Sequence, residues 1–343
     1  MSRISIFNKN GYFVGDIRAS TIRSWVKNVN PNPGECRFMV SRFDRKYSKK
    51  YLWFGNFVLV RHSTLPDWIG IIVDLKFGNG FVEVKALQAE FILRKRNTSI
   101  IDIRGVAGSL FSQIISNTNN EPFNEKPIYL NNVYYANPEK IQRTGSDALT
   151  LIQDIAERSK NDFDIKHLFD TNGRLYLSAN WYQRKGSITS KTLREGYNIK
   201  LTDGLLDQDA RMTINYLEGR GDASTTGTRN RTIAFDETSI SDIGLNQSSV
   251  VFSGNKEQVT VEASAINLLL QSRNPFKTFD LTALNVDDTF TYLDIGNVHT
   301  VDVNTVGFET YSNEQVETLG MEYDDSTDTC RLIAELYVSE TTQ

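Results

Sequence analysis

The last third of this 343-residue chain holds the pattern that restricts its fold most. A turn-like Ser-Ile-x-x-x-Gly segment at 239–244 is followed by an apolar repeat over 259–270, which stops before Pro275. Strand-like stretches at 279–284 and 293–298 come next. Proline has no N–H and holds the residue before it away from the α region, so a helix must end there. The pattern therefore predicts one helix set between β segments.

This helix is expected to begin near Asn255, whose side chain can accept hydrogen bonds from the free N–H groups of the first turn while Gln258 reaches back. The β-branched Val259 and Val261 lose rotamer freedom in a helix and weaken its start, so packing must hold it. The expected buried stripe follows helical spacing and consists of Val259, Ala263, Ile266 and Leu270.

Residues 1–104 alternate polar and apolar positions at a period of two, which predicts a β domain. Its clearest element is a hairpin with strands at 69–77 and 81–87. The Gly78-Asn79-Gly80 loop between them can reach positive φ at little cost and permits a tight reversal.

The character of the chain changes after residue 105. Apolar residues on one helical face predict an amphipathic helix over 105–117, followed by a short strand at 128–130 between loops. Cap-spaced Thr144 and Asp147 then introduce a second helix that runs to about Ser159. A turn at 171–173 and a strand at 174–179 complete a small α+β segment.

Strands resume beyond Gly196. The polar stretch 219–230, rich in Ser, Thr and Gly, predicts an exposed loop. The segment 276–338 predicts strands again, including one at 289–293 and a hairpin that turns at 324–328. The chain exceeds one core of usual size, so two or three domains of about 100–150 residues are expected.

The order of elements resembles siphophage tail-tip hub proteins, including the hub part of tail-associated lysins, and the hubs of contractile-tail baseplates. Asn215–Gly219 resembles the strand that leads into the second tube domain of that family. The 239–244 segment stands where the family turns into its helix, Pro275 where that helix stops, and Gly296 at a following strand entry. The resemblance covers most of the chain, and the stretch 234–303 carries it most specifically.

The resemblance implies a β-rich α+β fold in which two barrel-like tube domains, 1–104 and 206–343, flank a smaller α+β middle domain, 105–205. The second tube domain would carry an inserted helix segment, 241–275, packed near its barrel. A trimer of such chains presents six barrels in a ring and matches a six-fold tail tube.

The implied function is that of a structural hub in the distal tail of the virion, which closes the DNA channel until genome ejection. Its implied partners are two further copies of itself, the distal tail protein, the tape measure protein and a central fibre or tip protein. DNA would be met only in transit, and contact with the host envelope is open.

Composition and charge agree with a structural protein. The net charge of −4 argues against a duplex-DNA binder, which normally shows a basic excess on one face. One dense basic run, Arg42 to Lys50, lies beside Tyr47 and Tyr51 and would suit either a phosphate or membrane contact or a solvated loop.

The thiols and the N-terminus suggest a protein made in the host cytoplasm. Cys36 and Cys330 have no second thiol nearby in the sequence to suggest a metal site or redox pair. The N-terminal residues lack the apolar core of a signal peptide, and no run of about 18 apolar residues predicts a membrane-spanning helix.

Candidate catalytic groups are few, and we expect no enzyme, metal or cofactor. His62, His167 and His299 lack ligand-like spacing. Gly108-Ser109 and Gly145-Ser146 suit helix entries better than a nucleophile elbow. The acidic pairs Asp287-Asp288 and Asp324-Asp325 suit turns better than a glycosidase site, and Gly219-Arg220-Gly221 lacks the lysine of a phosphate loop.

Two alternatives stay open. Aromatic side chains could form a sugar-stacking face, which would indicate a glycan-binding or envelope-degrading tail protein, although packing in barrel cores and subunit contacts is the favoured interpretation of them. The candidates for that face are Trp25, Trp53, Trp68, Tyr47, Tyr51 and Phe54. The same fold also serves phage-like injection machines, and neighbouring sheath or spike genes would identify that case.

Overall fold

The computed structural model describes residues 2–337, apart from 18–20, 29–32, 97–104, 121–126, 136–146, 210, 212, 224–228, 253–257, 275 and 307–308. The chain forms two compact units. Unit 1 contains Met1–Asp203 and Asp280–Gln343, and unit 2 contains Gly204–Phe279. Unit 2 is therefore an insertion into unit 1.

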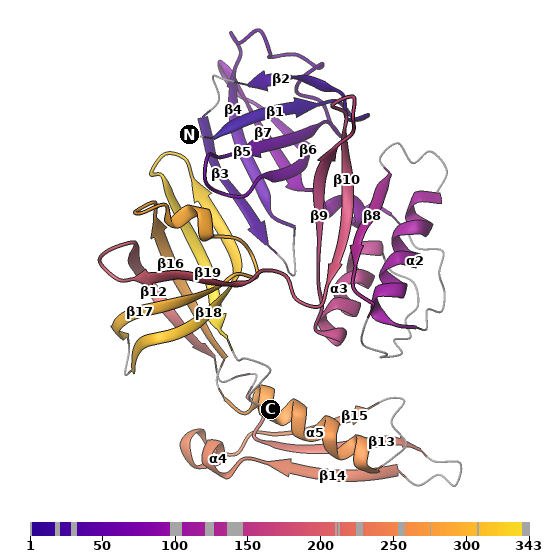
Figure 1. The fold of residues 1–343 in the computed structure, drawn as a ribbon, viewed down its shortest axis with the longest axis vertical. Coiled ribbons are helices and arrows are strands. Elements are labelled where there is room, and N and C mark those ends of the chain that lie inside the picture. The colour runs from indigo at the N-terminus through magenta and orange to yellow at the C-terminus, as the bar shows by residue number, and fades with distance from the viewer. Residues whose placement is uncertain are drawn as a thin grey trace. The chain divides into compact units, whose positions relative to one another are not determined.

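A 13-stranded sheet is the main feature of unit 1 (Figure 1). Its central path runs β12-β16-β19-β18-β3-β4-β7-β6-β5-β1-β2, with β17 beside β18 and β11 beside β17. The strands from the first part of the chain are β1 (Arg3–Phe7), β2 (Phe13–Ile17), β3 (Thr21–Asn28), β4 (Glu35–Ser41), β5 (Phe57–Arg61), β6 (Trp68–Phe77) and β7 (Phe81–Gln88). The others are β11 (Ile188–Arg194), β12 (Ile199–Asp209), β16 (Phe276–Leu284), β17 (Val298–Val306), β18 (Glu309–Asp324) and β19 (Thr329–Leu336).

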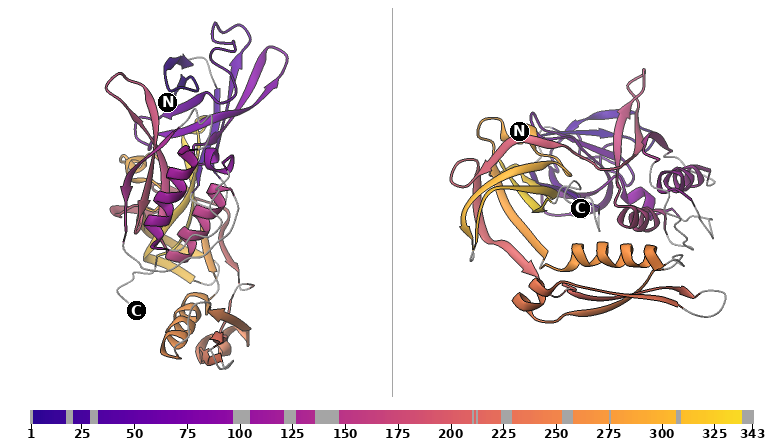
Figure 2. Two further views of the ribbon diagram at one scale, coloured as in Figure 1. Left: turned by 90° about the vertical axis from the view of Figure 1, so that its right-hand side faces the viewer. Right: turned by 60° about the horizontal axis from the view of Figure 1, so that its bottom comes forward.

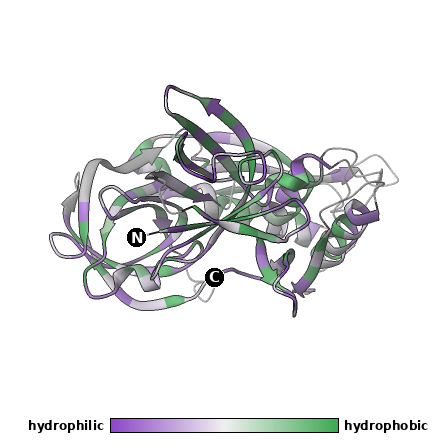
Figure 3. Ribbon diagram, turned by 90° about the horizontal axis from the view of Figure 1, so that it is seen from above, coloured by the Kyte–Doolittle hydropathy of each residue, from purple (hydrophilic) through white to green (hydrophobic). Residues whose placement is uncertain are grey.

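Strands from the two ends of the chain pair directly. β18 runs antiparallel to β3, with Gly320 opposite Asn28 and Tyr323 opposite Trp25. The predicted hairpins at 78–80 and 324–328 are confirmed as the turns between β6 and β7 and between β18 and β19. Alternating burial along β7 shows the physical basis of the first prediction, and Figure 3 shows hydrophobic and hydrophilic residues alternating along many strands.

A second layer of unit 1 consists of helices on a three-stranded sheet. β10 (Leu175–Tyr182) pairs in parallel with β8 (Ile128–Val133) and antiparallel with β9 (Asp162–Phe169). The helices α2 (Ala107–Asn120) and α3 (Ala148–Ser159) cover one face of this sheet (Figures 1 and 2). The short helix α1 (Phe91–Arg94) joins them to the large sheet.

The two helices predicted in this region are confirmed. Asp147 begins α3, because its carboxylate accepts a hydrogen bond from the Thr150 N–H at 3.0 Å. Thr144 lies outside the described residues. Strand β9 was not predicted, although Phe163 and Ile165 are buried and contribute to the core between sheet and helices.

Unit 2 is a small sheet with one long helix on it. β13 (Tyr216–Ala223) lies between β14 (Arg229–Phe235) and β15 (Gln247–Phe252), and α4 (Glu237–Ile243) connects the last two. The helix α5 (Gln258–Ser272) lies along the three strands (Figure 2, right). The predicted loop at 219–230 was wrong in its first part, because Gly219 to Ala223 pair as β13.

The helix segment predicted at 241–275 contains the end of α4, the strand β15 and the helix α5, and the buried stripe predicted for the helix was wrong. Val261, Ala265 and Leu269 are buried, whereas Val259 and Ile266 are 75% and 51% exposed. Both faces of α5 carry apolar residues at helical spacing, so periodicity alone could not select the face. The packing against Leu217 of β13 decides it. Asn255 lies outside the described residues.

The structure confirms a β-rich α+β fold with a large, mostly antiparallel sheet. Among the described strands, the pairing closes no barrel, so the two barrel-like domains stay a prediction, as does the division at 1–104, 105–205 and 206–343. The strand expected at 289–293 was wrong. It is a 3₁₀ turn, η1 (Thr289–Tyr292), held by a hydrogen bond from the Thr289 N–H to Val286 O. Within the described part of the chain, the helices are too short or too polar to cross a bilayer.

Candidate functional site

Buried charges meet in unit 1 where strands from the first, middle and last parts of the chain come together. Lys27 Nζ of β3 lies 2.7 Å from Asp294 Oδ1, which precedes β17. Lys185 Nζ lies 3.1 Å from Asp164 Oδ2 of β9, and both side chains are under one-tenth exposed. We call these four residues the charged junction. The two ion pairs connect segments that are far apart in the sequence.

The charges of the junction stabilise one another. Burial alone would raise the pKa of Asp164, but the ammonium groups of Lys185 and Lys166 outweigh it, so the pKa lies below its ordinary value. The pKa of Asp294 is lowered in the same way, against burial, by Lys27 and Lys185. Each carboxylate therefore stays ionised, although the side chain of Asp164 is 7% exposed and that of Asp294 is 31% exposed.

Glu90 lies beside the charged junction, and its pKa is shifted in the opposite direction. Burial raises the pKa of Glu90, and its Oε1 accepts a hydrogen bond from the Ile165 N–H at 3.1 Å. A cavity of about 230 Å³ lies against Lys27, Glu90, Asp164 and Asp294. Because its wall carries both signs of charge, it suits water better than one kind of ion. The ion pairs of the charged junction hold β3, β9 and the segment before β17 in place.

The three histidines lie in separate surroundings. His62 Nδ1 accepts hydrogen bonds from the Thr64 and Leu65 N–H groups, both at 3.3 Å. His299 is fully buried, with Nδ1 2.9 Å from Thr189 Oγ1, and burial lowers its pKa to about 4. His167 Nε2 lies 3.4 Å from Asp67. Within the described residues, no three His, Cys, Asp or Glu side chains gather as metal ligands would.

The acidic pairs have turn-forming roles. Asp287 and Asp288 both have positive φ, and the Tyr197 hydroxyl donates a hydrogen bond to Asp287. Asp324 Oδ1 accepts from the Ser326 N–H at 2.8 Å, as in an Asx turn. Asp325 Oδ1 accepts from the Ser2 N–H at 3.1 Å. Neither pair faces a described cavity.

The remaining predicted candidates are structural where they are described. Gly108 lies in the first turn of α2 against the backbone of Tyr134, while Gly145-Ser146 lies outside the described residues. Cys36 and Cys330 are buried free thiols, and burial raises the pKa of each. Gly219 packs under α5, where a Cβ would lie 3.0 Å from that of Ala265.

The alternative of a sugar-stacking face is not supported at two of its tryptophans, which fill the core as the favoured interpretation had it. Trp25 and Trp68 are each 1% exposed, and Trp68 Nε1 donates to Val26 O at 2.9 Å. Trp53 and Phe54 are exposed and lie 5.3 Å apart between ring centroids. Two of the three proposed tryptophans therefore belong to the core, because β3 and β6 bury one face against the protein interior.

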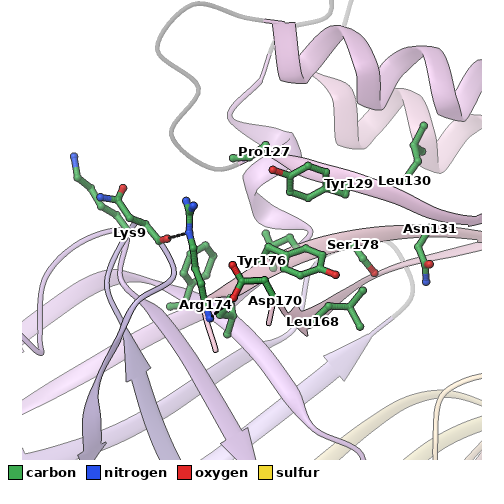
Figure 4. Close-up of a pocket in the computed structure, with 14 residues that line it drawn as sticks. Lys9, Pro127, Tyr129, Leu130, Asn131, Leu168, Asp170, Arg174, Tyr176 and Ser178 are labelled. Atoms are coloured by element: carbon green, nitrogen blue, oxygen red, sulfur yellow. Dashed lines mark hydrogen bonds between the residues drawn. The ribbon is translucent and has the colours of Figure 1, made fainter. Parts of the chain in front are cut away.

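An open cavity of about 420 Å³ lies beside the helix-free face of the β8-β10-β9 sheet (Figure 4). The rings of Tyr129 and Tyr176, from neighbouring strands, meet edge to face with centroids 5.4 Å apart. Arg174 Nε donates to Asn10 O at 2.6 Å and fixes one wall. Sequence reasoning missed this cavity. The signal available was the pair of tyrosines on strands whose alternate residues are apolar.

No family model matches the sequence, and no curated protein matches it significantly. Solved structures do match over nearly its whole length. A 43 kDa tail protein of prophage MuSo2 from Shewanella oneidensis is 12% identical with a TM-score of 0.62, over 97% of this chain and 98% of that one. A tail protein from Neisseria meningitidis MC58 is 12% identical with a TM-score of 0.63, over 98% and 96%.

A third match comes from a complex that contains a VgrG protein. The Francisella PdpA–VgrG complex contains a chain that is 13% identical with a TM-score of 0.52, over 98% of this chain but 58% of that one. At these identities the likeness concerns the fold. The chain thus has the fold of phage tail proteins, which VgrG-type proteins share.

Proposed function

We propose that this protein is a structural hub of a phage tail tip or baseplate. The observation that carries the proposal is the full-length fold likeness to two tail proteins, one of them from a prophage, which leaves almost no part of either chain unmatched. The direct pairing of β3 with β18 supports it, because one continuous sheet lets a single chain serve as a rigid ring segment. No catalytic centre is part of the proposal.

The hub would act as a homotrimer that adapts a six-fold tail tube to a central fibre or tip. In this role it contacts the distal tail protein and the tape measure protein, and it closes the channel until DNA passes. The net charge of −4 supports transit without binding, because a like-charged wall repels the phosphates.

Two measurements test this role. Light scattering of the purified protein should give a mass near three times 38.9 kDa. Gold label on a tagged copy, in particles made by the encoding genome, should lie at the distal end of the tail. Label along the whole tube, or particles that assemble normally without the protein, would contradict the hub.

The likeness to a VgrG-containing complex favours a second candidate, the hub of a phage-like injection machine. Gene neighbourhood separates the two. Tape-measure and distal-tail genes beside this one support a virion tail, whereas sheath and spike genes without capsid genes support the injection machine. The glycan-binding alternative loses Trp25 and Trp68, which are core residues.

A further inference from the structure

One end of unit 1 exposes large aromatic side chains among positive charges. The β4–β5 loop, residues 42–56, lies beside the β6–β7 hairpin, where the Arg42 N–H donates to Gly80 O at 2.8 Å (Figure 1, purple strands and loops). Phe43 is 90% exposed and Phe77 is 69% exposed. Trp53, Phe54 and Phe81 are exposed as well. We call this loop and hairpin tip the basic aromatic surface.

Its positive charges outnumber the negative ones. Five cations stand against Asp44 in nine residues, in a chain whose net charge is −4. They are Arg42, Arg45, Lys46, Lys49 and Lys50. Within the described part of the chain, none of them forms an ion pair with a carboxylate. Lys49 Nζ lies 4.6 Å from the ring centroid of Trp53 instead, and Lys46 and Lys50 lie over Tyr51.

The loop is held in shape, so its exposed rings do not fold back onto the protein. Asn56 Nδ2 donates to the carbonyls of Lys50 and Tyr51 at 3.1 and 3.0 Å. Leu52 is buried, and the Tyr51 ring packs against Gly15 of β2. A preorganised surface loses little conformational entropy when it binds.

We propose that the basic aromatic surface binds the anionic phospholipid surface of a membrane. Exposed aromatic rings are favoured at the level of lipid headgroups, and each lysine or arginine near an anionic surface adds attraction. The charges and the rings occur here together, on projecting loops. This inference goes beyond the hub role and does not depend on it.

The exposure of the rings favours lipid over nucleic acid as the ligand of this surface. Proteins that bind single strands combine stacking rings with a positively charged groove. The two described cavities lie elsewhere in unit 1, and no residue of the loop at 42–56 lines either of them. A flat membrane needs projecting tips, which the loop and hairpin provide.

Trp53 supplies a built-in reporter for the test. It is 43% exposed, while Trp25, Trp68 and Trp181, the chain's other tryptophans, are each 1% exposed. We would mix the full-length protein with vesicles of phosphatidylcholine, with or without phosphatidylglycerol. The expected result is co-sedimentation with the anionic vesicles, a blue shift of tryptophan emission, and loss of both at high salt.

Variants locate the binding surface. The double charge reversal K49E/K50E should lower the vesicle affinity about tenfold or more, because each reversed charge turns attraction into repulsion. Its control is K95E/K160E, which makes the same charge change at exposed sites outside the surface. F43S/F77S should weaken binding and reduce the blue shift, and I188S, at a 61% exposed isoleucine, is its control.

Three results would overturn the proposal. The first is equal binding to vesicles with and without phosphatidylglycerol. The second is a loss of binding in the control variants that matches the loss in the surface variants. The third is binding of a single-stranded oligonucleotide or an acidic protein, abolished by K49E/K50E, without binding to vesicles. Circular dichroism of each variant separates misfolding from lost contact.

Discussion

Unit 1 and unit 2 are each stabilised by a different kind of core. Unit 1 has an extended apolar core in which Trp181 and Phe111 pack with ring centroids 4.9 Å apart, and it also buries the charged junction. The core of unit 2 contains Leu217, Ala265 and Leu269, with partly buried side chains around them. Within the described residues, this cluster is smaller than that of unit 1, which leaves more of the stability of unit 2 to hydrogen bonds.

Asn215 is the main polar contact in unit 2. Its side chain is fully buried, accepts a hydrogen bond from the Asn246 N–H at 2.7 Å and donates one to Gly244 O at 2.7 Å. It thus joins the start of β13 to the turn after α4. We therefore expect the largest loss in free energy of unfolding when a large core side chain of unit 1 is removed. Unit 2 should unfold after the truncation of a smaller side chain.

The largest effect is expected from Trp181→Ala. Removing a fully buried indole should lower the free energy of unfolding of unit 1 by about 3–5 kcal/mol. Urea denaturation followed by hydrogen exchange and mass spectrometry would measure the change in each unit. Trp53→Ala, at an exposed position, is the control. Equal loss of protection in peptides of unit 2 would show that the two units unfold together.

Asp164→Asn should cost nearly as much, because it leaves Lys185 buried without its partner, and broken buried pairs typically cost about 3–5 kcal/mol. The lowered pKa of Asp164 also sets a pH dependence. The stability that it contributes is present above the carboxyl's ordinary pKa and is lost as the pH falls through the folded-state pKa. Asp302→Asn, whose carboxylate pairs with Arg194 at the surface, is the control.

Thermal unfolding at neutral and acidic pH would check this prediction. The wild type should lose stability on acidification, and Asp164→Asn should lose less because its contribution is already absent. A variant with the full acid sensitivity of the wild type would show that the charged junction does not contribute to the stability of unit 1.

Leu269→Ala tests the smaller core. The expected loss is about 2–5 kcal/mol, and it should unfold unit 2 while unit 1 stays folded. Limited proteolysis should then cut within 204–279 and leave the rest intact. Val259→Ala on the opposite face of α5 should leave the digestion pattern unchanged. A global unfolding transition in Leu269→Ala would contradict the independence of unit 2.

The smallest effect concerns Glu317, which Arg184 Nη2 contacts at 2.6 Å and which pairs across the strands with Glu335. Burial raises the pKa of Glu317 to about 7, with Arg184 acting against the rise and Asp162 and Glu335 adding to it. Because the folded form holds its proton more tightly, stability should fall as the pH rises from the ordinary carboxyl pKa to about 7.

Glu317→Gln should flatten this pH dependence of the stability of unit 1. Chemical denaturation at several pH values between about pH 5 and neutral pH would measure it. Unit 2 offers the contrast, since the backbone N–H of Ser239 and the Arg273 side chain lower the pKa of Asp236. Asp236→Asn should therefore leave the slope between pH 5 and neutral unchanged. An unchanged slope in Glu317→Gln would place the titrating group elsewhere.

Local patterns were enough to predict the hairpins and two of the helices. Gly78 to Gly80 marked one turn, and Asp147 marked a helix start, because such signals act over a few residues. Long-range contacts decided the rest. The buried face of α5 depends on Leu217, and the charged junction unites Lys27 with Asp294, pairs that no local pattern connects.

The pairing of Asn28 with Gly320 has a consequence for how this protein is made. A ribosome releases β3 early and β18 late, so the edge of β3 that pairs with β18 in the folded protein has no partner through most of translation. Unpaired strand edges invite association with other chains, and distant pairings form slowly. We expect the nascent chain to need a chaperone until its last strands emerge, and the completed sheet to serve as the checkpoint for release.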